Sequence, residues 1–440
     1  MDSSNVEKVV AKEIELHQQL KNLDCIGFDM DMTIVRYHNV ELQLLVNQCM
    51  SKTLAPKFPH LANDKLELEI CHRGIILDLD TGYILKLGSN KRVLKAFFGS
   101  QAVDKKTILE TYESQPIPEN RPLHSFNGSS TSRFFALISY FDIPAASLWV
   151  HHIDHLVKQG VTVTRPLMLE FLQALIDTFN IHFTDFYKGE YYEEFRKNPG
   201  KFVIKATEKC KNWLRELKNN GTKVLLITNS KSEYTDLLMK YCYGEDFQDL
   251  FDLVVADAKK PDFFKKDRPF YDLESYFPKV VNQIQVDEVV FNKKTVYNHG
   301  NVKTLMDQVR KSKGKSETDL ISFCYVGDHL IGDVSVPKQF SKWMTIAIVE
   351  EIEDPNEIVV LKKKTNYKDG NRYEWGSFFH FHEHDSQQVP IETYWSSIVR
   401  ENADIMLGSV ETLAEYFHQD KFDKQSLQPC AVIYQNDSDF

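Results

Sequence analysis

The most constraining feature of this 440-residue sequence is a set of five short apolar runs, the first four of which end directly in polar residues. They occupy residues 23–28, 224–227, 251–256, 321–326 and 343–349. Short apolar runs that alternate with helical stretches are typical of buried parallel strands. The pattern therefore predicts an α/β fold with a doubly wound, Rossmann-like parallel sheet.

The spacing of these runs predicts how the chain is divided. About 195 residues separate the first run from the second, far more than an ordinary connection between a strand and a helix. We therefore expect a discontinuous core, residues 1–45 and 200–440, with a large cap domain, residues 46–199, inserted between its parts. The stretch between Asp257 and Ile321 is interpreted as a second, smaller insertion.

Local patterns predict several further elements. Residues 75–79 and 83–87 flank a short turn that ends in Gly82, and this arrangement predicts a hairpin. The other predicted elements are helices over 165–179 and 232–241, a mobile polar loop over 127–132 and a solvated loop over 362–372.

Polar residues follow the first two runs, at the edge of the sheet where open parallel folds bind ligands. Asp29 and Asp31 come directly after the first run. Two carboxylates so close together are costly unless a metal ion or hydrogen bonds compensate for their repulsion. Thr228, Asn229 and Ser230 follow the second run, where hydroxyls and free amides of a helix N-terminus suit an anion. Asn229 or Ser230 is also the expected N-cap of that helix.

The third and fourth runs are followed by a cation and by two further carboxylates. Lys260 follows the third run, and the adjacent Lys259 fits the pattern with a shift of one residue. Asp328 and Asp333 follow the fourth run, and Asp333 is either a ligand or a structural neighbour of one. A cleft with hard oxygen ligands, a hydroxyl and a lysine is suited to Mg²⁺-assisted phosphoryl transfer.

Taken in order, the four strand ends resemble the four motifs of the haloacid dehalogenase (HAD) superfamily of phosphotransferases. The longer segments around them are similar to the cytosolic purine 5'-nucleotidase family, across roughly residues 20 to 420. These segments are Gly27-Phe28-Asp29-Met30-Asp31-Met32-Thr33, Ile227-Thr228-Asn229-Ser230 with Tyr234-Thr235-Asp236, Phe251-Asp252 with Asp257-Ala258-Lys259-Lys260-Pro261 and Phe263-Phe264, and Gly327-Asp328-His329 with Gly332-Asp333.

The resemblance implies a Mg²⁺-dependent phosphomonoester hydrolase that acts on a small phosphorylated substrate, a nucleoside 5'-monophosphate. Asp29 would be the nucleophile that forms an aspartyl-phosphate, and Asp31 would protonate the leaving group and then deprotonate water. The residues implied for Mg²⁺ are Asp29, Asp31 through its carbonyl, Asp328 and Asp333, and those implied for the phosphoryl oxygens are Thr228, Asn229, Ser230 and Lys260.

One departure from the family pattern concerns the substrate. The purine nucleotidases offer an arginine, an aspartate and a lysine to the nucleotide, and an ungapped alignment places Phe179, Phe183 and Tyr192 at these positions. Aromatic rings can stack on a base but do not read its edge as charged groups do. Two alternatives to a nucleotidase therefore stay open: a phosphatase of a non-nucleotide ester, and a scaffold of low activity that retains the fold.

Composition narrows the remaining functional classes. The chain has 53 Lys and Arg against 63 Asp and Glu, a formal net charge of −10, which argues against a nucleic-acid partner. No apolar run approaches the roughly 18 residues of a membrane span, and the N-terminus has no pattern of a secretory signal. Seven scattered cysteines without a C-x-x-C pair are typical of reduced thiols, so we expect a cytoplasmic protein. The sequence is compatible with a homo-oligomer.

Three further patterns have simpler interpretations. Asp78 and Asp80 imitate a second D-x-D motif, but they belong to the tip of the predicted hairpin. His329 is interpreted as the start of a helix rather than as a catalytic group. His380, His382 and His384 alternate and would share one face of a strand, for which a metal site is the alternative interpretation.

Overall fold

The computed structural model describes residues 3–113, 117, 133–277, 284–341, 343–353, 375–381 and 391–419. By its internal contacts the chain divides into two compact units. Unit 1 comprises Met1–Tyr37, Val203–Asp354 and Ile398–Phe440, and unit 2 comprises His38–Phe202 and Pro355–Ser397. Both units are therefore assembled from pieces that lie far apart in the sequence.

Unit 1 is built on a sheet that is largely parallel. In the described part of the chain its strands are β1 (Cys25–Phe28), β9 (Lys223–Ile227), β10 (Leu253–Ala256), β11 (Phe270–Asp272), β12 (Ile284–Val286), β13 (Tyr297–His299), β14 (Phe323–Gly327), β15 (Met344–Ile348) and β18 (Ile405–Leu407). Their spatial order is β12-β11-β13-β10-β9-β1-β14-β15-β18. The pairs from β13 to β18 are parallel, whereas β11 runs antiparallel to β12 and β13. The α/β class and the parallel centre of the sheet are thus confirmed.

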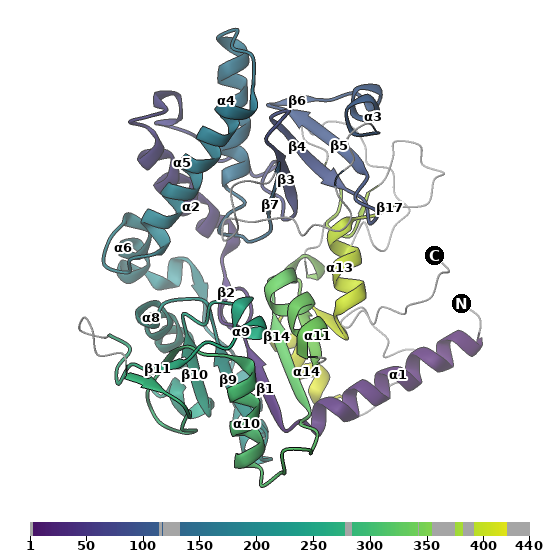
Figure 1. Ribbon diagram of the computed structural model, residues 1–440, viewed down its shortest axis with the longest axis vertical. Coiled ribbons are helices and arrows are strands. Elements are labelled where there is room, and N and C mark those ends of the chain that lie inside the picture. The colour runs from purple at the N-terminus through teal and green to yellow at the C-terminus, as the bar shows by residue number, and fades with distance from the viewer. Residues whose placement is uncertain are drawn as a thin grey trace. The chain divides into compact units, whose positions relative to one another are not determined.

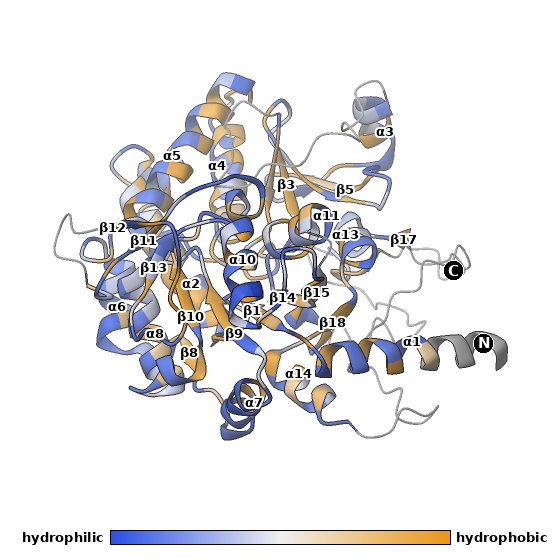
Figure 2. Cartoon of the chain, turned by 60° about the horizontal axis from the view of Figure 1, so that its bottom comes forward, coloured by the Kyte–Doolittle hydropathy of each residue, from blue (hydrophilic) through white to orange (hydrophobic). Residues whose placement is uncertain are grey.

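The central strands form because their side chains are apolar and buried on both faces. Every residue of β1, β10 and β14 is buried, and Figure 2 shows β1, β9 and β10 in orange. Figure 1 shows β1, in purple, next to β9 and β14, which come much later in the chain. Gly27 permits this packing, because a Cβ there would lie 2.9 Å from the ring of Tyr325. The five predicted runs are the strands β1, β9, β10, β14 and β15.

Helices and short helical turns connect the strands of unit 1. They are α1 (Ser3–Lys21), α7 (Glu208–Asn219), α8 (Ser232–Tyr243), η3 (Phe247–Leu250), α9 (Asp262–Lys265), α10 (Val302–Ser312), η4 (Leu330–Ser335), α11 (Val336–Ser341), η5 (Glu350–Ile352) and α14 (Val410–Phe417). Thr207, Asn301 and Ser409 cap α7, α10 and α14, because the side chain of each accepts a hydrogen bond from a backbone N–H of the first turn. The helix predicted over 232–241 is α8.

The N-cap of α8 differs from the expected one. Lys231 occupies this position and makes no capping hydrogen bond through its side chain. The prediction of Asn229 or Ser230 was wrong because both side chains are engaged elsewhere. Asn229 bonds to the backbone of Lys260, and Ser230 donates to the carboxylate of Asp31.

The stretch between Asp257 and Ile321 is not a separate insertion, as the sequence had indicated. It supplies β11, β12, β13 and α10, and β13 pairs in parallel with β10. Phe270, Tyr297 and Leu305 from this stretch are buried in one cluster with residues of β9, β10 and β14. This shared apolar core makes the stretch an extension of the unit 1 sheet.

Unit 2 contains an antiparallel sheet and several helices. The strands, in spatial order, are β6 (Gln101–Ala102), β5 (Val93–Phe98), β4 (Tyr83–Leu87), β3 (Ile75–Asp78) and β7 (Phe134–Leu137). The helical elements are α2 (Asn39–Leu54), η1 (Pro59–Leu61), α3 (Lys105–Glu113), α4 (Ala145–Lys158), α5 (Arg165–Phe183), α6 (Glu190–Lys197) and η2 (Pro199–Lys201). The predicted hairpin is β3–β4, and the predicted helix over 165–179 is α5, which continues to Phe183.

A segment near the C-terminus also belongs to unit 2, although the predicted division had left it with the core. The segment contains β16 (His380–Phe381), β17 (Ile391–Glu392) and the start of α13 (Tyr394–Asn402). Lys86 donates to the backbone oxygen of Ser377, and the indole of Trp395 donates to that of Gly74. A Cβ at Gly74 would lie 2.2 Å from the Trp395 ring, so glycine is needed for this contact. The roles of the units as core and cap stay a prediction.

The remaining local predictions have different outcomes. Asp78 accepts hydrogen bonds from Thr81 and from the backbone of Asp80, which is the expected hairpin tip. The loops predicted over 127–132 and 362–372, and the residues His382 and His384, lie outside the described residues. Among the helices of the described part, none is both long and apolar enough to cross a bilayer.

His151 on α4 forms ionic hydrogen bonds with Asp64 and Glu67 within unit 2. Burial by itself would lower the pKa of His151, but the two carboxylates outweigh it and raise this pKa to about 9. The folded pKa therefore lies above the value of about 6.5 expected for an unfolded histidine. Protonated His151 should stabilise the fold fully below about pH 6.5, and this stabilisation should be lost as the pH rises through 9.

We predict that His151→Gln lowers the free energy of unfolding by about 1–3 kcal/mol at pH 6, because the variant loses these interactions with the protonated ring. At pH 10 the difference from wild type should nearly vanish. Urea denaturation of both proteins at the two pH values measures the effect. A difference that does not change with pH would contradict the assignment.

Candidate active site

Four loops meet at one edge of the unit 1 sheet because the strands before them are neighbours and run parallel. In the order β10-β9-β1-β14, the strands are followed by Lys260, Thr228, Asp29 and Asp328. The backbone ladder continues into the loops, since the N–H of Thr228 donates to Val255 and that of Asp29 donates to Val326. The sheet thus brings together four positions that span about 300 residues of sequence.

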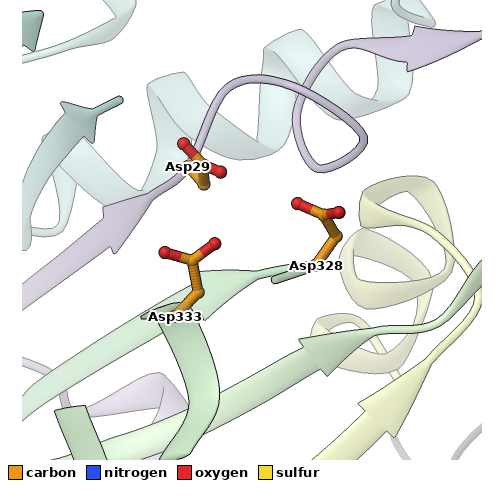
Figure 3. Close-up of side chains that lie close together, drawn as sticks. All are labelled: Asp29, Asp328 and Asp333. Atoms are coloured by element: carbon orange, nitrogen blue, oxygen red, sulfur yellow. The ribbon is translucent and has the colours of Figure 1, made fainter. Parts of the chain in front are cut away.

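Asp29, Asp328 and Asp333 form a cluster of carboxylates at this edge. Figure 3 shows the three side chains converging, Asp29 from the loop after β1 and the other two from the segment after β14. One carboxylate oxygen of each lies within 4.8 Å of the others, and all three residues are buried. A Cβ at Gly327 would lie 2.3 Å from that of Asp333. Glycine at the end of β14 therefore makes room for the third carboxylate.

The turn η4 brings Asp333 back to the end of β14. The N–H of Asp333 donates to the backbone oxygen of His329 at 2.8 Å. The Nδ1 atom of His329 accepts from the N–H of Gly332 at 2.9 Å, so this side chain caps the turn. The interpretation of His329 as a helix start is confirmed.

Lys260 places its ammonium group between two of the carboxylates. Its Nζ lies 2.7 Å from Asp29 Oδ1 and 2.8 Å from Asp333 Oδ1, with a side chain only 3% exposed. The same Nζ donates to the hydroxyl of Tyr325 at 3.1 Å. Lys259, by contrast, is 43% exposed and pairs with Asp257. Lys260, and not the adjacent Lys259, therefore lies beside the carboxylate cluster.

The close packing of these charges changes their protonation. Burial raises the pKa of Asp29 to about 7; Lys260 opposes the increase, and the charge of Asp333 adds to it. Burial by itself would lower the pKa of Lys260, but Asp29 and Asp333 outweigh it and hold this pKa well above its usual value. The lysine is therefore a fixed cation at the site.

Asp31 lies beside this cluster and is held through both of its oxygens. Tyr37 donates to Oδ1 and Ser230 donates to Oδ2, each at 2.5 Å. Burial and the neighbouring charge of Asp29 raise the pKa of Asp31 to about 6, although the two hydrogen bonds act in the opposite direction. A carboxyl group with such a pKa can both donate and accept a proton near neutral pH.

The residues after β9 have different surroundings. Thr228 is buried, its Oγ1 accepts from the N–H of Ser230, and its backbone oxygen accepts from Ala258. The side chain of Asn229 bonds to the backbone of Lys260 in both directions, through Oδ1 at 2.6 Å and Nδ2 at 3.0 Å. Asn229 therefore fixes the backbone position of Lys260. The phosphate-binding roles expected for these residues stay a prediction.

Three tyrosines at the site carry no role in the motif-based interpretation. They are Tyr37, which contacts Asp31, Tyr234, whose hydroxyl lies 3.2 Å from that of Tyr37, and Tyr325, which contacts Lys260. Each ring is almost fully buried. Tyr234 belongs to a segment that resembles the nucleotidase family, but in the sequence a tyrosine that only packs cannot be distinguished from one whose hydroxyl is bonded. No signal in the sequence therefore gives the contacts of these hydroxyls.

The donor set of the carboxylate cluster fits a hard divalent cation. Asp29 Oδ1 and Asp333 Oδ1 are buried, and each lies within ion-pair distance of Lys260 Nζ. When ionised, the three carboxylates and one ammonium leave a net charge of −2, which a divalent cation would offset. Oxygen ligands of this kind suit Mg²⁺. Within the described residues, this is the one group of acidic, histidine or cysteine side chains with such geometry.

Comparison with known proteins identifies the family of the chain. A family model described as the 5' nucleotidase family matches residues 15–374. The chain belongs to this family. Human 5'-nucleotidase domain-containing protein 1 is 31% identical over 388 residues, which are 82% of this chain and 83% of the human protein. The bovine protein of the same name is 30% identical over 387 residues, 82% of each chain.

A more distant relative extends the comparison. A 5'-nucleotidase domain-containing protein of Dictyostelium discoideum is 26% identical over 376 residues, which are 80% of this chain and 58% of that protein. The resemblance to the nucleotidase family drawn from the four motifs is confirmed. As a member of this family, the chain is a 5'-nucleotidase-like phosphatase.

The buried position of Lys260 leads to a stability prediction. Lys260→Met should lower the free energy of unfolding by about 3–5 kcal/mol in the presence of a chelator, because Asp29 and Asp333 lose their buried counter-ion. Lys259→Met is the matched control and should cost less than about 1 kcal/mol, since the Lys259 side chain is 43% exposed and Asp257 keeps its ion pair with Lys231. Chemical denaturation of the three proteins measures both effects. Equal losses in the two variants would contradict the distinction between the lysines.

Proposed function

We propose that this member of the 5'-nucleotidase family is a Mg²⁺-dependent phosphomonoesterase that forms an aspartyl-phosphate on Asp29. The observation that supports this most strongly is the placement of Asp29 beside Lys260, Asp328 and Asp333 at the end of β1. A nucleophilic carboxylate, a fixed cation and a set of oxygen ligands are then in one place. The family and the names of the relatives support the same reaction class.

Mg²⁺ would be held by the carboxylates of Asp29 and Asp328 and by the backbone carbonyl of Asp31, with Asp333 as a further ligand or a neighbour. When bound, the ion would offset negative charge on the phosphoryl oxygens and on the attacking carboxylate. Lys260 would contribute a second, permanent positive charge, and Thr228 would offer a hydroxyl to a phosphoryl oxygen.

In the first step, a carboxylate oxygen of Asp29 attacks phosphorus while the bond from phosphorus to the ester oxygen breaks. An alkoxide is a poor leaving group, so Asp31 gives its proton to that oxygen. The products are the aspartyl-phosphate and the free alcohol. The pKa of about 6 supports this role, since a fraction of Asp31 keeps its proton near neutral pH.

In the second step, water attacks the phosphorus of the aspartyl-phosphate. Asp31, now ionised, accepts a proton from this water, and the bond between phosphorus and the Asp29 oxygen breaks. Inorganic phosphate leaves, and both carboxyl groups return to their starting state. A single residue thus serves as acid and then as base, which requires that its position hardly change between the steps.

Nucleoside 5'-monophosphates are the substrates that we propose, on the ground of the family and the relatives. A phosphatase of a non-nucleotide ester is the second candidate, and the residues of unit 2 favour it in one respect. Phe179 and Phe183 stack on each other, and Tyr192 is buried and donates its hydroxyl to the backbone of Phe183. These positions carry no charge with which to read a base.

We further propose that unit 1 is a catalytic core of the HAD type and that unit 2 acts as a cap that selects the substrate and excludes water. The parallel sheet of unit 1 supports the first part, since the predicted motifs follow its central strands. A cytoplasmic location is proposed as well, and the six described cysteines, all free and mostly buried, support it.

Phosphate release by the purified protein tests the proposal. With Mg²⁺ present we expect turnover of nucleoside 5'-monophosphates, and Asp29→Asn should lower kcat by roughly 10⁴-fold or more because the nucleophile is lost. Removal of divalent cations with EDTA should abolish the activity, and added Mg²⁺ should restore it.

Two controls make the result specific. Asp262→Asn, at the start of the short helix α9, should leave activity within about threefold of wild type, because its partners Lys266 and Arg268 lie at the surface. A panel of sugar phosphates separates the two candidate functions, and faster turnover of a sugar phosphate than of any nucleotide would favour the second. Equal activity of wild type and Asp29→Asn would refute the mechanism.

A further inference from the structure

The carboxyl group of Asp31 is held by donors from two separate segments. Tyr37 lies in β2 (Arg36–Tyr37) and donates to Oδ1, while Ser230 lies in the loop after β9 and donates to Oδ2. With a hydrogen bond on each oxygen, the carboxyl plane cannot rotate without breaking one of them. Each oxygen keeps a second lone-pair direction, so the group can still carry or accept a proton.

The direction of these bonds follows from proton counting. A carboxylate only accepts, so the one hydroxyl proton of Tyr37 points to Asp31. The hydroxyls of Tyr37 and Tyr234 lie 3.2 Å apart, and either could donate if taken alone. When Asp31 is ionised, the proton of Tyr37 is committed to it, so Tyr234 donates to Tyr37. The result is a chain of two hydrogen bonds, from Tyr234 to Tyr37 and from Tyr37 to the carboxylate of Asp31.

Both rings are fixed by their surroundings. Tyr37 and Tyr234 are 4% and 3% exposed. The backbone of Tyr37 is opposite Val203 in the antiparallel pair of β2 with β8 (Val203–Ile204). Tyr234 lies in the first turn of α8, which begins at the loop that carries Ser230. Hydroxyls on rings held this firmly impose one orientation on the group they bind.

We propose that Tyr37, supported by Tyr234, is a positioning residue that aims the carboxyl group of Asp31 at the ester oxygen of the substrate. The inference rests on the function proposed above and goes beyond it, since it assigns a role to residues outside the four motifs. Proton transfer is sensitive to the placement of the donor. Attack by Asp29 on phosphorus does not involve Tyr37.

Because Tyr37 would affect proton donation by Asp31 but not attack by Asp29, its role can be measured with two esters that differ in their leaving groups. An alkoxide needs a proton as it leaves, whereas a dinitrophenolate leaves without one. The ratio kcat/KM covers the steps up to departure of the leaving group and does not include hydrolysis of the aspartyl-phosphate. A defect in aiming Asp31 should therefore lower kcat/KM for an alkyl phosphate and spare it for an activated aryl phosphate. A general loss of structure would lower both.

The experiment compares kcat/KM for a nucleoside 5'-monophosphate and for 2,4-dinitrophenyl phosphate, with Mg²⁺ present. For Tyr37→Phe we expect a loss of roughly 10- to 100-fold with the nucleotide and of less than about threefold with the aryl ester. Tyr234→Phe removes only the outer hydroxyl and should show a smaller selective loss, about 3- to 10-fold. It also serves if Tyr37→Phe fails to fold. Asp31→Asn is the reference and should show the strongest selectivity.

Tyr243→Phe is the matched control. Its buried hydroxyl donates to the backbone oxygen of Ile34, in the same loop as Asp31 but without touching that residue. Any effect of this variant should be equal for the two esters. Thermal unfolding of every variant checks that the fold is retained.

The outcomes separate the inference from the function on which it rests. If Asp31→Asn is selective but both tyrosine variants lose equally on the two esters, or lose nothing, the positioning role is refuted and the proposed function stands. If the wild type hydrolyses neither ester, or if Asp31→Asn shows no selectivity, the proposed acid fails and the positioning role fails with it. Selective loss in Tyr37→Phe and Tyr234→Phe supports the inference.

Discussion

Burial of several carboxylates at one edge of a sheet costs free energy, and in this protein the ammonium group of Lys260 offsets a large part of that cost. Its contacts with Asp29 and Asp333 join the loops after β10, β1 and β14. Asn229 fixes the lysine backbone from the loop after β9. The four loops are therefore coupled through one cation, and removal of Lys260 would leave Asp29 and Asp333 buried without their counter-ion.

Much of the fold could be predicted because it depends on patterns that are local in the sequence. A run of apolar residues that ends in Asp29 or Thr228 is sufficient to place a buried strand and the chemistry at its end. The same reasoning failed for the stretch after Asp257, which was predicted to be a separate insertion. Its strands β11, β12 and β13 are only three residues long and lie among lysines and aspartates. Strands so short join the sheet because β13 pairs with β10 and β11 pairs with β13, and because Phe270 and Tyr297 are buried. Neither the pairing nor the burial has a local signature.

The site shows the same division between local and distant causes. The types of Asp29, Lys260 and Asp328 are apparent from their motifs, and their proximity follows from the order of parallel strands. The partner of a hydroxyl, by contrast, is decided by tertiary packing. Ser230 could be expected to cap a helix or bind an anion, yet it donates to Asp31, which lies 199 residues away in the sequence. Tyr325 likewise contacts Lys260 over 65 residues, and the hydroxyl of Tyr37 bonds to Asp31 at a separation of six residues. The partner of such a hydroxyl is therefore known only from the folded structure.

The pairing of β2 with β8 has a consequence for the architecture of the chain. Arg36 and Tyr37 lie opposite Ile204 and Val203, so the longer piece of unit 2, residues 38–202, begins and ends at two adjacent strands of unit 1. The entropy needed to close a loop grows only slowly with its length once the ends are held together. The length of this piece therefore has little effect on the entropy needed to hold its ends together. Two short strands fix both ends of the His38–Phe202 segment at one place in unit 1.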